Sequence, residues 1–174
     1  MNLKEKIRTI DDWPKKGIKF RDITTLLQDS EAFEYACSLF YNKYWDKHID
    51  VVVGIESRGF IFGAVLANML KCGFVPVRKE GKLPYKKMKQ EYSLEYGNAA
   101  VEIHKDSIKE DQRILIVDDL LATGGTCSAA IKLIELLGGK IIGCAFLIEL
   151  PDLKGREKID SKYNVFSIIK IGDE

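Results

Sequence analysis

The chain has 174 residues, 46% of them hydrophobic, so it is long enough to bury a core without disulfide or metal support. Its 27 basic and 26 acidic residues give a net charge of +1, which argues against a general nucleic-acid or membrane-surface binder. Residues 1–14 lack the apolar run of a signal peptide, and the uncharged stretch 59–70 is too short to span a membrane. We expect a cytoplasmic protein with neither a nucleic-acid nor a membrane partner.

Four cysteines, Cys37, Cys72, Cys127 and Cys144, are widely spaced and form no CxxC pair, and the two histidines stand apart from them. This spacing is not typical of a zinc site or of a disulfide framework. We expect thiols in a reducing compartment.

Helical and extended patterns alternate along the chain. The pattern predicts a short helix over residues 2–10, a turn at 13–17, and a helix that Ser30 caps and that runs to about Tyr44. Short apolar runs predict strands over residues 51–53, 74–77, 114–117, 141–148 and 165–169, and apolar periodicity predicts helices over 60–70 and 126–137. Apolar strands separated by helices indicate an α/β fold, a parallel sheet covered on both faces, with ligands at the carboxyl ends of its strands.

The polar segment 81–92 has no clean period and contains Gly, Pro and several Lys residues. We expect it to be a long functional or mobile loop. Residues 78–89 hold six basic residues and one acid, a local charge of +5 that the near-neutral total conceals.

The segment after Val117 carries the clearest chemistry. Asp118 and Asp119 follow an apolar strand, and Gly124 and Gly125 precede a helix. Glycines that turn backbone N–H groups inward at a helix N-terminus can bind a phosphate, and two carboxylates can accept hydrogen bonds from sugar hydroxyls. The neighbouring Gly-Lys-Ser/Thr of a P-loop and a GxGxxG motif are both absent. A capped loop with a tight turn would explain each element alone, but the whole string favours a ligand with phosphate and ribose.

Residues 114–126, ILIVDDLLATGGT, resemble the phosphoribosyl-pyrophosphate (PRPP) motif of the type I phosphoribosyltransferases, and LLATGGT resembles the adenine-specific members. Similar segments occur in the same order elsewhere in the chain: GIKFRDI at 17–23, GIESRGFIFG at 54–63, RKEGKLP at 78–84, YSLEYG at 92–97 and LKGREK at 153–158. The resemblance covers residues 5–170.

The resemblance implies a single domain over residues 1–174 with the type I phosphoribosyltransferase fold. That fold has a mainly parallel twisted sheet with helices on both faces, a small N-terminal hood over about residues 1–25, and a mobile loop over about residues 81–97. It implies Mg²⁺-dependent transfer of phosphoribose from PRPP to adenine, which gives AMP and pyrophosphate in purine salvage. It also implies a homodimer, because the 78–82 segment of relatives reaches the neighbouring subunit's site.

The resemblance also assigns roles to residues. Glu95 is the proton-transfer carboxylate and Arg58 the second catalytic residue. No residue ligates a metal directly, and Mg²⁺ sits on the pyrophosphate of PRPP, reached through water from Asp118 or Asp119. In some relatives the peptide between residues matching Glu56 and Ser57 is cis. The residues implied to bind PRPP or AMP are Ser57, Arg58, Lys79, Tyr96, Asp118, Asp119, Ala122, Thr123, Gly124, Gly125 and Thr126, and those implied to bind adenine are Lys19, Phe20 and Arg21.

Two other functions remain open at this point. One is a PRPP-sensing regulator without catalysis, which the single-domain length, the +1 charge and the intact Glu95 motif disfavour. The other is an enzyme of the same fold for hypoxanthine, xanthine or orotate, against which only the resemblance of GIKFRDI argues. Residues 84–92 are more basic than expected of relatives, and the segment 98–100 lacks an acidic residue often found there. These departures leave the behaviour of the loop open.

Overall fold

Seven strands form one sheet in the part of the chain that the structure describes, residues 1–94 and 97–172 of a computed structural model. The four pairings among five of these strands are parallel, and the remaining two strands pair antiparallel at one edge. In spatial order the strands are β5 (Lys87–Ser93), β6 (Asn98–His104), β4 (Gly73–Lys79), β3 (Val51–Ile55), β7 (Arg113–Leu121), β8 (Lys140–Glu149) and β9 (Val165–Lys170). The predicted α/β fold with a mainly parallel sheet is confirmed.

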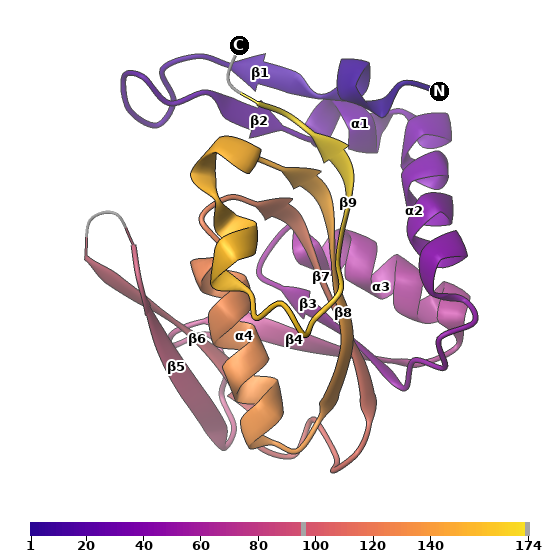
Figure 1. Ribbon diagram of the computed structural model, residues 1–174, viewed down its shortest axis with the longest axis vertical. Helices are drawn as coiled ribbons and strands as arrows, with labels where there is room; N and C mark the ends of the chain where they lie inside the picture. Colours follow the sequence, from indigo (N-terminus) through magenta and orange to yellow (C-terminus); the bar gives the residue numbers. More distant parts are fainter. Residues whose placement is uncertain (95–96, 173–174) are drawn as a thin grey trace. The chain divides into compact units, whose positions relative to one another are not determined.

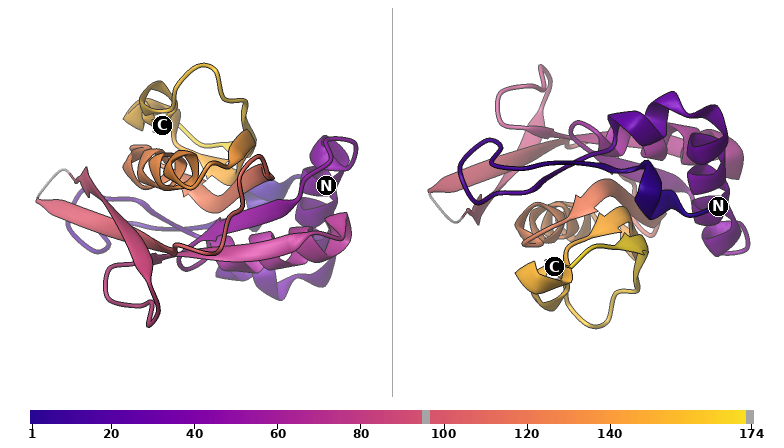
Figure 2. Two further views of the ribbon diagram at one scale, coloured as in Figure 1. Left: turned by 90° about the horizontal axis from the view of Figure 1, so that it is seen from below. Right: turned by 90° about the horizontal axis from the view of Figure 1, so that it is seen from above.

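Two helices cover opposite faces of this sheet, as Figures 1 and 2 show. Helix α3 (Gly59–Leu70) packs on β3, β4 and β7, and α4 (Gly125–Leu136) packs on the other face. Gly138, at a φ of +84°, follows the end of α4, where a left-handed conformation costs glycine little.

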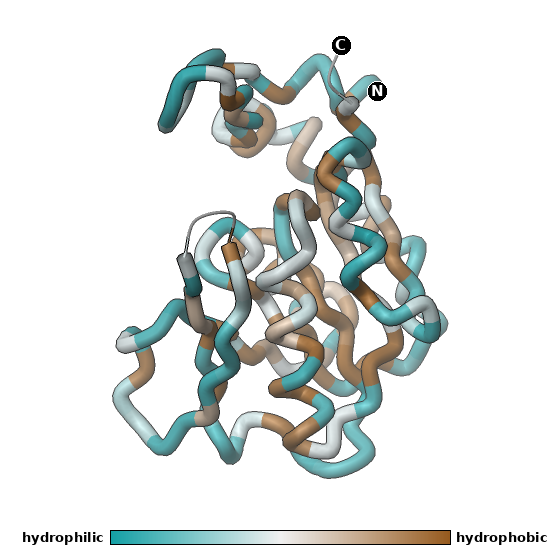
Figure 3. Tube along the Cα trace, turned by 60° about the vertical axis from the view of Figure 1, so that its left-hand side comes forward, coloured by the Kyte–Doolittle hydropathy of each residue, from teal (hydrophilic) through white to brown (hydrophobic). Residues whose placement is uncertain are grey.

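Successive side chains of the central strands alternate between the two faces. Val51, Val53 and Ile55 of β3 join Ile114 and Ile116 of β7 in the buried cluster beneath α4. Each central strand is apolar throughout because helices cover both faces. Figure 3 shows the hydrophobic strands in the interior and the hydrophilic turns around them.

The chain divides into a small unit, residues 1–39, and a large unit, residues 40–174, which holds the whole seven-stranded sheet. The small unit contains a 3₁₀ turn (η1, Leu3–Lys6), the antiparallel pair β1 (Arg8–Ile10) and β2 (Phe20–Asp22), and α1 (Thr24–Gln28). The prediction of a helix over residues 2–10 is therefore wrong: the β-branched Thr9 and Ile10 pair with β2 instead.

Helix α2 (Ser30–Tyr44) has the predicted extent, but its cap differs from the prediction. Asp29 Oδ1 accepts the backbone N–H of Ala32 at 3.1 Å, so Asp29 caps the helix and Ser30 lies inside it.

The expected long loop over residues 81–97 is the largest difference from the sequence prediction. Residues 87–93 form β5, which pairs with β6 from Lys87↔His104 to Ser93↔Asn98. Two short 3₁₀ turns also follow β8, namely η2 (Pro151–Leu153) and η3 (Gly155–Lys158). The extent of the domain, the N-terminal hood and the mobility of the loop stay predictions.

Among the described residues, no helix has both the length and the apolar character needed to cross a membrane.

Candidate active site

The segments after β3 and β7 meet at one edge of the sheet. The two strands are parallel neighbours, and Gly54 pairs with Val117, so their carboxyl ends lie side by side. Gly59 makes the close approach feasible, since a Cβ at that position would lie 2.8 Å from both Asp118 Oδ1 and the Val117 carbonyl oxygen. Only glycine lets the start of α3 lie this close to the end of β7.

Asp118 and Asp119 lie within β7, whereas the sequence pattern placed them in a loop. The strand continues to Leu121 because β8 keeps pairing with it, from Asp118↔Phe146 to Leu121↔Glu149. Strand β3 ends at Ile55, so the side of β7 that faces β3 is free of a strand partner beyond Val117. The two carboxylates therefore project from a fixed strand.

A cavity of about 300 Å³ lies at this edge. Its lining brings together seven of the residues implied to bind PRPP: Ser57, Arg58, Lys79, Asp118, Asp119, Ala122 and Thr126. It also includes four residues that the sequence reasoning missed: Glu56, Tyr92, Val101 and Leu120.

The glycine-rich segment forms a second, smaller cavity of about 70 Å³. Thr123, Gly124 and Gly125 line it together with Phe146 of β8. Gly124 has a φ of +78° and precedes the first residue of α4, so the helix N-terminus opens at this cavity. Free N–H groups and the helix dipole make such a place favourable for an anion. The two cavities are adjacent, since both are lined by Asp118, Leu120, Ala122 and Thr126.

The two acids share one cation. Arg58 Nε lies 2.8 Å from Asp119 Oδ2, and the Asp119 side chain is only 7% exposed. Burial raises the pKa of Asp119, and the nearby Arg58 partly opposes that rise. Burial, and then the charge of Asp119, raise the pKa of Asp118 well above its ordinary range. The pair therefore accepts donors readily, because any hydroxyl that donates to it stabilises a poorly solvated charge.

Glu56 fixes the segment after β3 to the end of β4. Its Oε2 accepts the backbone N–H of Lys79 at 2.9 Å and lies 3.2 Å from Arg78 Nε. Burial alone would raise the pKa of Glu56, but these donors and the nearby cations lower it overall. The peptide between Glu56 and Ser57 is cis, as in the relatives that the resemblance implied.

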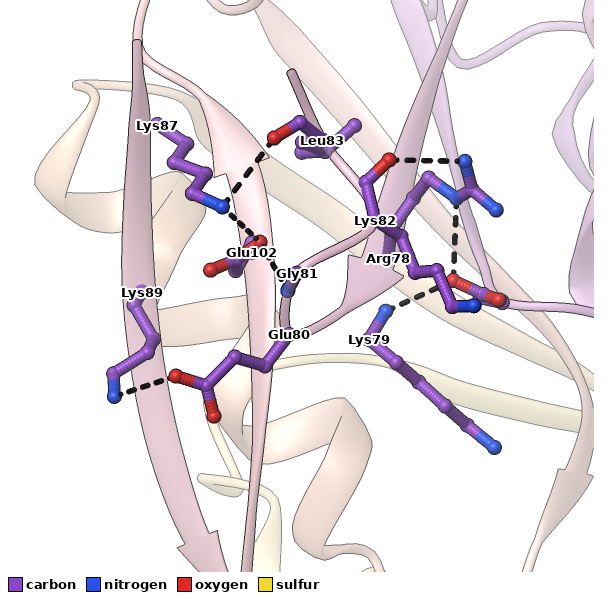
Figure 4. A network of polar contacts seen from close by, with 10 residues as sticks. Arg78, Lys79, Glu80, Gly81, Lys82, Leu83, Lys87, Lys89 and Glu102 are labelled. Carbon is purple, nitrogen blue, oxygen red and sulfur yellow. Dashed lines mark hydrogen bonds and ion pairs between the residues drawn. The ribbon is translucent and has the colours of Figure 1, made fainter. Parts of the chain in front are cut away.

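Three of the six basic residues of segment 78–89, namely Arg78, Lys87 and Lys89, form ion pairs with carboxylates of the protein, as Figure 4 shows. Lys87 pairs with the buried Glu102 at 3.0 Å, and Lys89 pairs with Glu80 at 3.0 Å. The Lys79 side chain extends away from this network (Figure 4), and its ammonium forms no ion pair with the described residues. Lys79 is thus the cation of this segment that faces the 300 Å³ cavity.

Tyr92 connects the β5–β6 hairpin to the glycine-rich segment. A Cβ on Gly125 would lie 3.0 Å from Tyr92 Cδ2, so the ring rests against the start of α4. Glu95 and Tyr96, which the resemblance implied as site residues, lie outside the described residues.

The residues implied to bind adenine belong to the small unit. Phe20 contacts Trp13 edge-on, with ring centroids 4.4 Å apart, and Arg21 Nη1 donates to Thr9 Oγ1 at 2.7 Å. The latter bond spans the β1–β2 pair, in which Thr9 and Arg21 are partners. Lys19 immediately precedes β2.

The side-chain oxygens at the cavity could hold Mg²⁺ only together with oxygens that a bound ligand contributes. No group of three or more His, Cys, Asp or Glu side chains in residues 1–94 and 97–172 could hold a metal. Mg²⁺ prefers octahedral oxygen ligands and is commonly bound by one or two carboxylates, waters and substrate phosphates. Asp118 and Asp119 fit that arrangement.

The parallel sheet, the paired acids and the glycine-rich helix start together define a phosphoribosyltransferase. The family model "Phosphoribosyl transferase domain" matches residues 24–173. The adenine phosphoribosyltransferase of Desulfosudis oleivorans is 55% identical over all of both chains, and that of Clostridium tetani is 56% identical over 98% of both. The chain belongs to the adenine phosphoribosyltransferase family, whose members are pentosyltransferases.

Solved structures agree with this assignment. The adenine phosphoribosyltransferase of Thermoanaerobacter pseudethanolicus is 51% identical, with a TM-score of 0.94 over 97% of this chain and 98% of that chain. The enzyme from Saccharomyces cerevisiae is 39% identical, with a TM-score of 0.90 over 95% and 96% of the two chains. That structure was determined in complex with adenine and an imino-altritol bisphosphate.

Proposed function

We propose that this chain transfers the 5-phosphoribosyl group of PRPP to adenine and releases pyrophosphate and AMP. A bond forms between a ring nitrogen of adenine and C1′ of the ribose, the C1′–O bond to pyrophosphate breaks, and adenine loses one proton. The observation that carries the proposal is that two acids, an arginine and a glycine-rich helix start line two adjacent cavities.

In this proposal the smaller cavity holds the 5′-phosphate. The N–H groups around Gly124 and Gly125 and the hydroxyls of Thr123 and Thr126 are its donors. Asp118 and Asp119 accept hydrogen bonds from the ribose hydroxyls. Positive charge develops on the sugar as pyrophosphate leaves, and the same carboxylates favour that charge.

The leaving pyrophosphate requires positive charge at the opposite side of the sugar. Arg58 can bind two phosphate oxygens at once, and Lys79 adds a point charge from β4. Ser57, between the cis peptide and Arg58, contributes a hydroxyl. When bound, Mg²⁺ neutralises negative charge on the pyrophosphate oxygens, and Asp118 or Asp119 would hold it through water.

Adenine recognition falls to the small unit in this proposal. The ring of Phe20 stacks on the base, the backbone C=O and N–H of Lys19 read its edge, and Arg21 keeps the shape of the β1–β2 pair. Glu95 takes the proton that adenine loses, which is the role that its position in the YSLEYG segment implies. Tyr96, next to it, contacts a phosphate of PRPP.

We further propose a homodimer that works in the cytoplasm. The dimer rests on the resemblance of the 78–82 segment to relatives in which this segment reaches a neighbouring site. The reducing compartment is supported by four free cysteines, three of them buried. Sedimentation velocity of the purified chain tests the dimer directly.

The test of the function is a panel of bases. The purified chain is incubated with Mg²⁺, PRPP and, separately, adenine, hypoxanthine, guanine, xanthine and orotate, while pyrophosphate release and nucleotide formation are followed. We expect turnover with adenine and formation of AMP. Turnover with another base but not with adenine would indicate a different phosphoribosyltransferase. PRPP binding without turnover on any base would indicate a PRPP sensor.

A further inference from the structure

The segment that follows β8 lies against the glycine-rich segment, although the two are separated by about thirty residues in the sequence. A Cβ on Gly155 would lie 2.0 Å from the Ala122 carbonyl oxygen and 2.9 Å from Gly124 N. Conversely, a Cβ on Gly124 would lie 2.2 Å from the Gly155 carbonyl oxygen. The two backbones are therefore in direct contact, and neither position has room for a side chain.

Gly155 makes this contact from outside the proposed phosphate cavity. It does not line either of the two site cavities, but lines a separate cavity of about 830 Å³ together with Arg156 and other residues after β8. A change at Gly155 would therefore reach the phosphate donors through the backbone of residues 122–124 rather than by touching the ligand.

Arg156 holds η3 in place against the sheet. Its Nε and Nη2 donate to the two carboxylate oxygens of Glu149 at 2.9 and 2.5 Å, and its Nη1 donates to the Val165 carbonyl oxygen at 2.8 Å. The Glu149 side chain is 6% exposed. One guanidinium thus joins η3 to β8 and β9 in a two-pronged geometry that a lysine cannot reproduce.

Glu149 also lies directly beside the start of the glycine-rich segment. It pairs with Leu121, the residue before Ala122, and the Leu150 N–H donates to the Leu121 carbonyl oxygen at 2.9 Å. The chain of contacts therefore runs from β9 through Arg156 to Glu149, and through Gly155 to the backbone of residues 122–124.

We propose that Gly155 and Arg156 are positioning residues of the transfer reaction, which hold the backbone of residues 122–125 in its phosphate-binding shape before the ligand arrives. The inference rests on the proposed function, because it assumes that this segment binds the 5′-phosphate. A preformed set of donors binds more tightly than one that the ligand must order.

The test compares Gly155→Ala with wild type by calorimetric titration with ribose 5-phosphate and, separately, adenine. We expect a roughly 10- to 100-fold weaker affinity for ribose 5-phosphate, because the loss of one hydrogen bond to a charged group has an effect of about that size. Adenine affinity should stay within about two-fold, and the KM for PRPP should rise more than kcat falls. Gly73→Ala is the matched control, since its new Cβ would make only ordinary contacts, 3.6 Å from Val51 Cγ2.

A second pair of variants keeps the proposal testable if Gly155→Ala does not fold. Arg156→Gln removes the two-pronged bond and should also weaken ribose 5-phosphate binding, whereas Arg156→Lys should restore only part of the affinity. NMR backbone order parameters of the wild type need no variant: without ligand, residues 122–125 should have the values of rigid backbone, about 0.85, and values below about 0.6 would overturn the proposal.

The outcomes separate the two claims. Folded Gly155→Ala and Arg156→Gln variants with wild-type affinity for ribose 5-phosphate would overturn the positioning role alone. Failure of the wild-type chain to bind ribose 5-phosphate would overturn the phosphate role of residues 122–126 and the positioning role with it.

Discussion

Replacing Gly59 by alanine tests whether the contact between α3 and β7 sets the position of Asp118. The added Cβ would lie 2.8 Å from Asp118 Oδ1, 2.8 Å from the Val117 carbonyl oxygen and 3.1 Å from the Asp118 Cα. Two of these three atoms are backbone atoms, which cannot rotate away, so either α3 or the end of β7 must move.

The size of the movement follows from these distances. Ordinary van der Waals contact begins near 3.4 Å, so the new methyl group requires a shift of about 0.6 Å. Overpacking of this kind costs about 1–3 kcal/mol of stability. A displacement of about 1 Å at a reacting group can cost about 100-fold in rate, so we expect kcat/KM for PRPP to fall roughly 10- to 100-fold.

Gly63→Ala provides the control, because it adds the same methyl group to the same helix away from the cavity. Its Cβ would lie 2.9 Å from Phe74 Cε2, a side-chain atom, and its other close neighbour is Gly54 Cα. Both variants are compared by thermal unfolding and by steady-state kinetics. We expect only the Gly59 variant to lose kcat/KM, and wild-type kinetics in that variant would refute the reasoning.

Four further predictions concern charge. Asp118→Asn or Asp119→Asn should weaken PRPP binding in calorimetry. Either substitution should also raise the free energy of unfolding at neutral pH, because the raised pKa of each folded-state carboxyl means that its charge destabilises the fold there. This gain should vanish as the pH falls below about 4, where the carboxyl is protonated in the folded and the unfolded chain. Lys79→Met should weaken PRPP binding roughly 10-fold and reduce its salt dependence; an unchanged salt slope would contradict the role. Glu95→Gln should lower kcat about 100-fold or more with little change in PRPP affinity; unchanged kcat would exclude proton transfer. Hydrogen bonds from the Thr24 hydroxyl and N–H and from the Arg8 guanidinium lower the pKa of Asp22 to about 2, so its contribution to stability, present above about pH 4, should be lost towards pH 2. The Asp22→Asn variant should not show this loss of stability between about pH 4 and pH 2 in acid unfolding.

The parallel core could be predicted from sequence because its signal is local. Runs such as residues 51–53 and 114–117 are apolar throughout, and helices of clear periodicity follow them. The hairpin of β5 and β6 was missed because β5 is an edge strand with only half-buried residues on its inner face. Met88, Gln90 and Tyr92 alternate there with exposed Lys89, Glu91 and Ser93, so the two-residue period is present but weakly hydrophobic.

In the candidate site, too, some residues have a local sequence signal and others do not. Asp118, Asp119 and the glycines are contiguous, and their chemistry can be recognised within one segment. Glu56 and Tyr92 reach the cavity only through long-range pairing of β3 with β4 and of β5 with β6, which no local pattern shows. Gly155 is a similar case, since its function depends on a backbone contact with a distant segment.

The most direct test of the account is a crystal structure of this chain with ribose 5-phosphate. We expect the phosphate within hydrogen-bond distance of the backbone N–H groups of residues 123–126, with the ribose hydroxyls on Asp118 and Asp119. A phosphate bound elsewhere, such as in the 830 Å³ cavity beside Arg156, with the glycine-rich segment free, would contradict it.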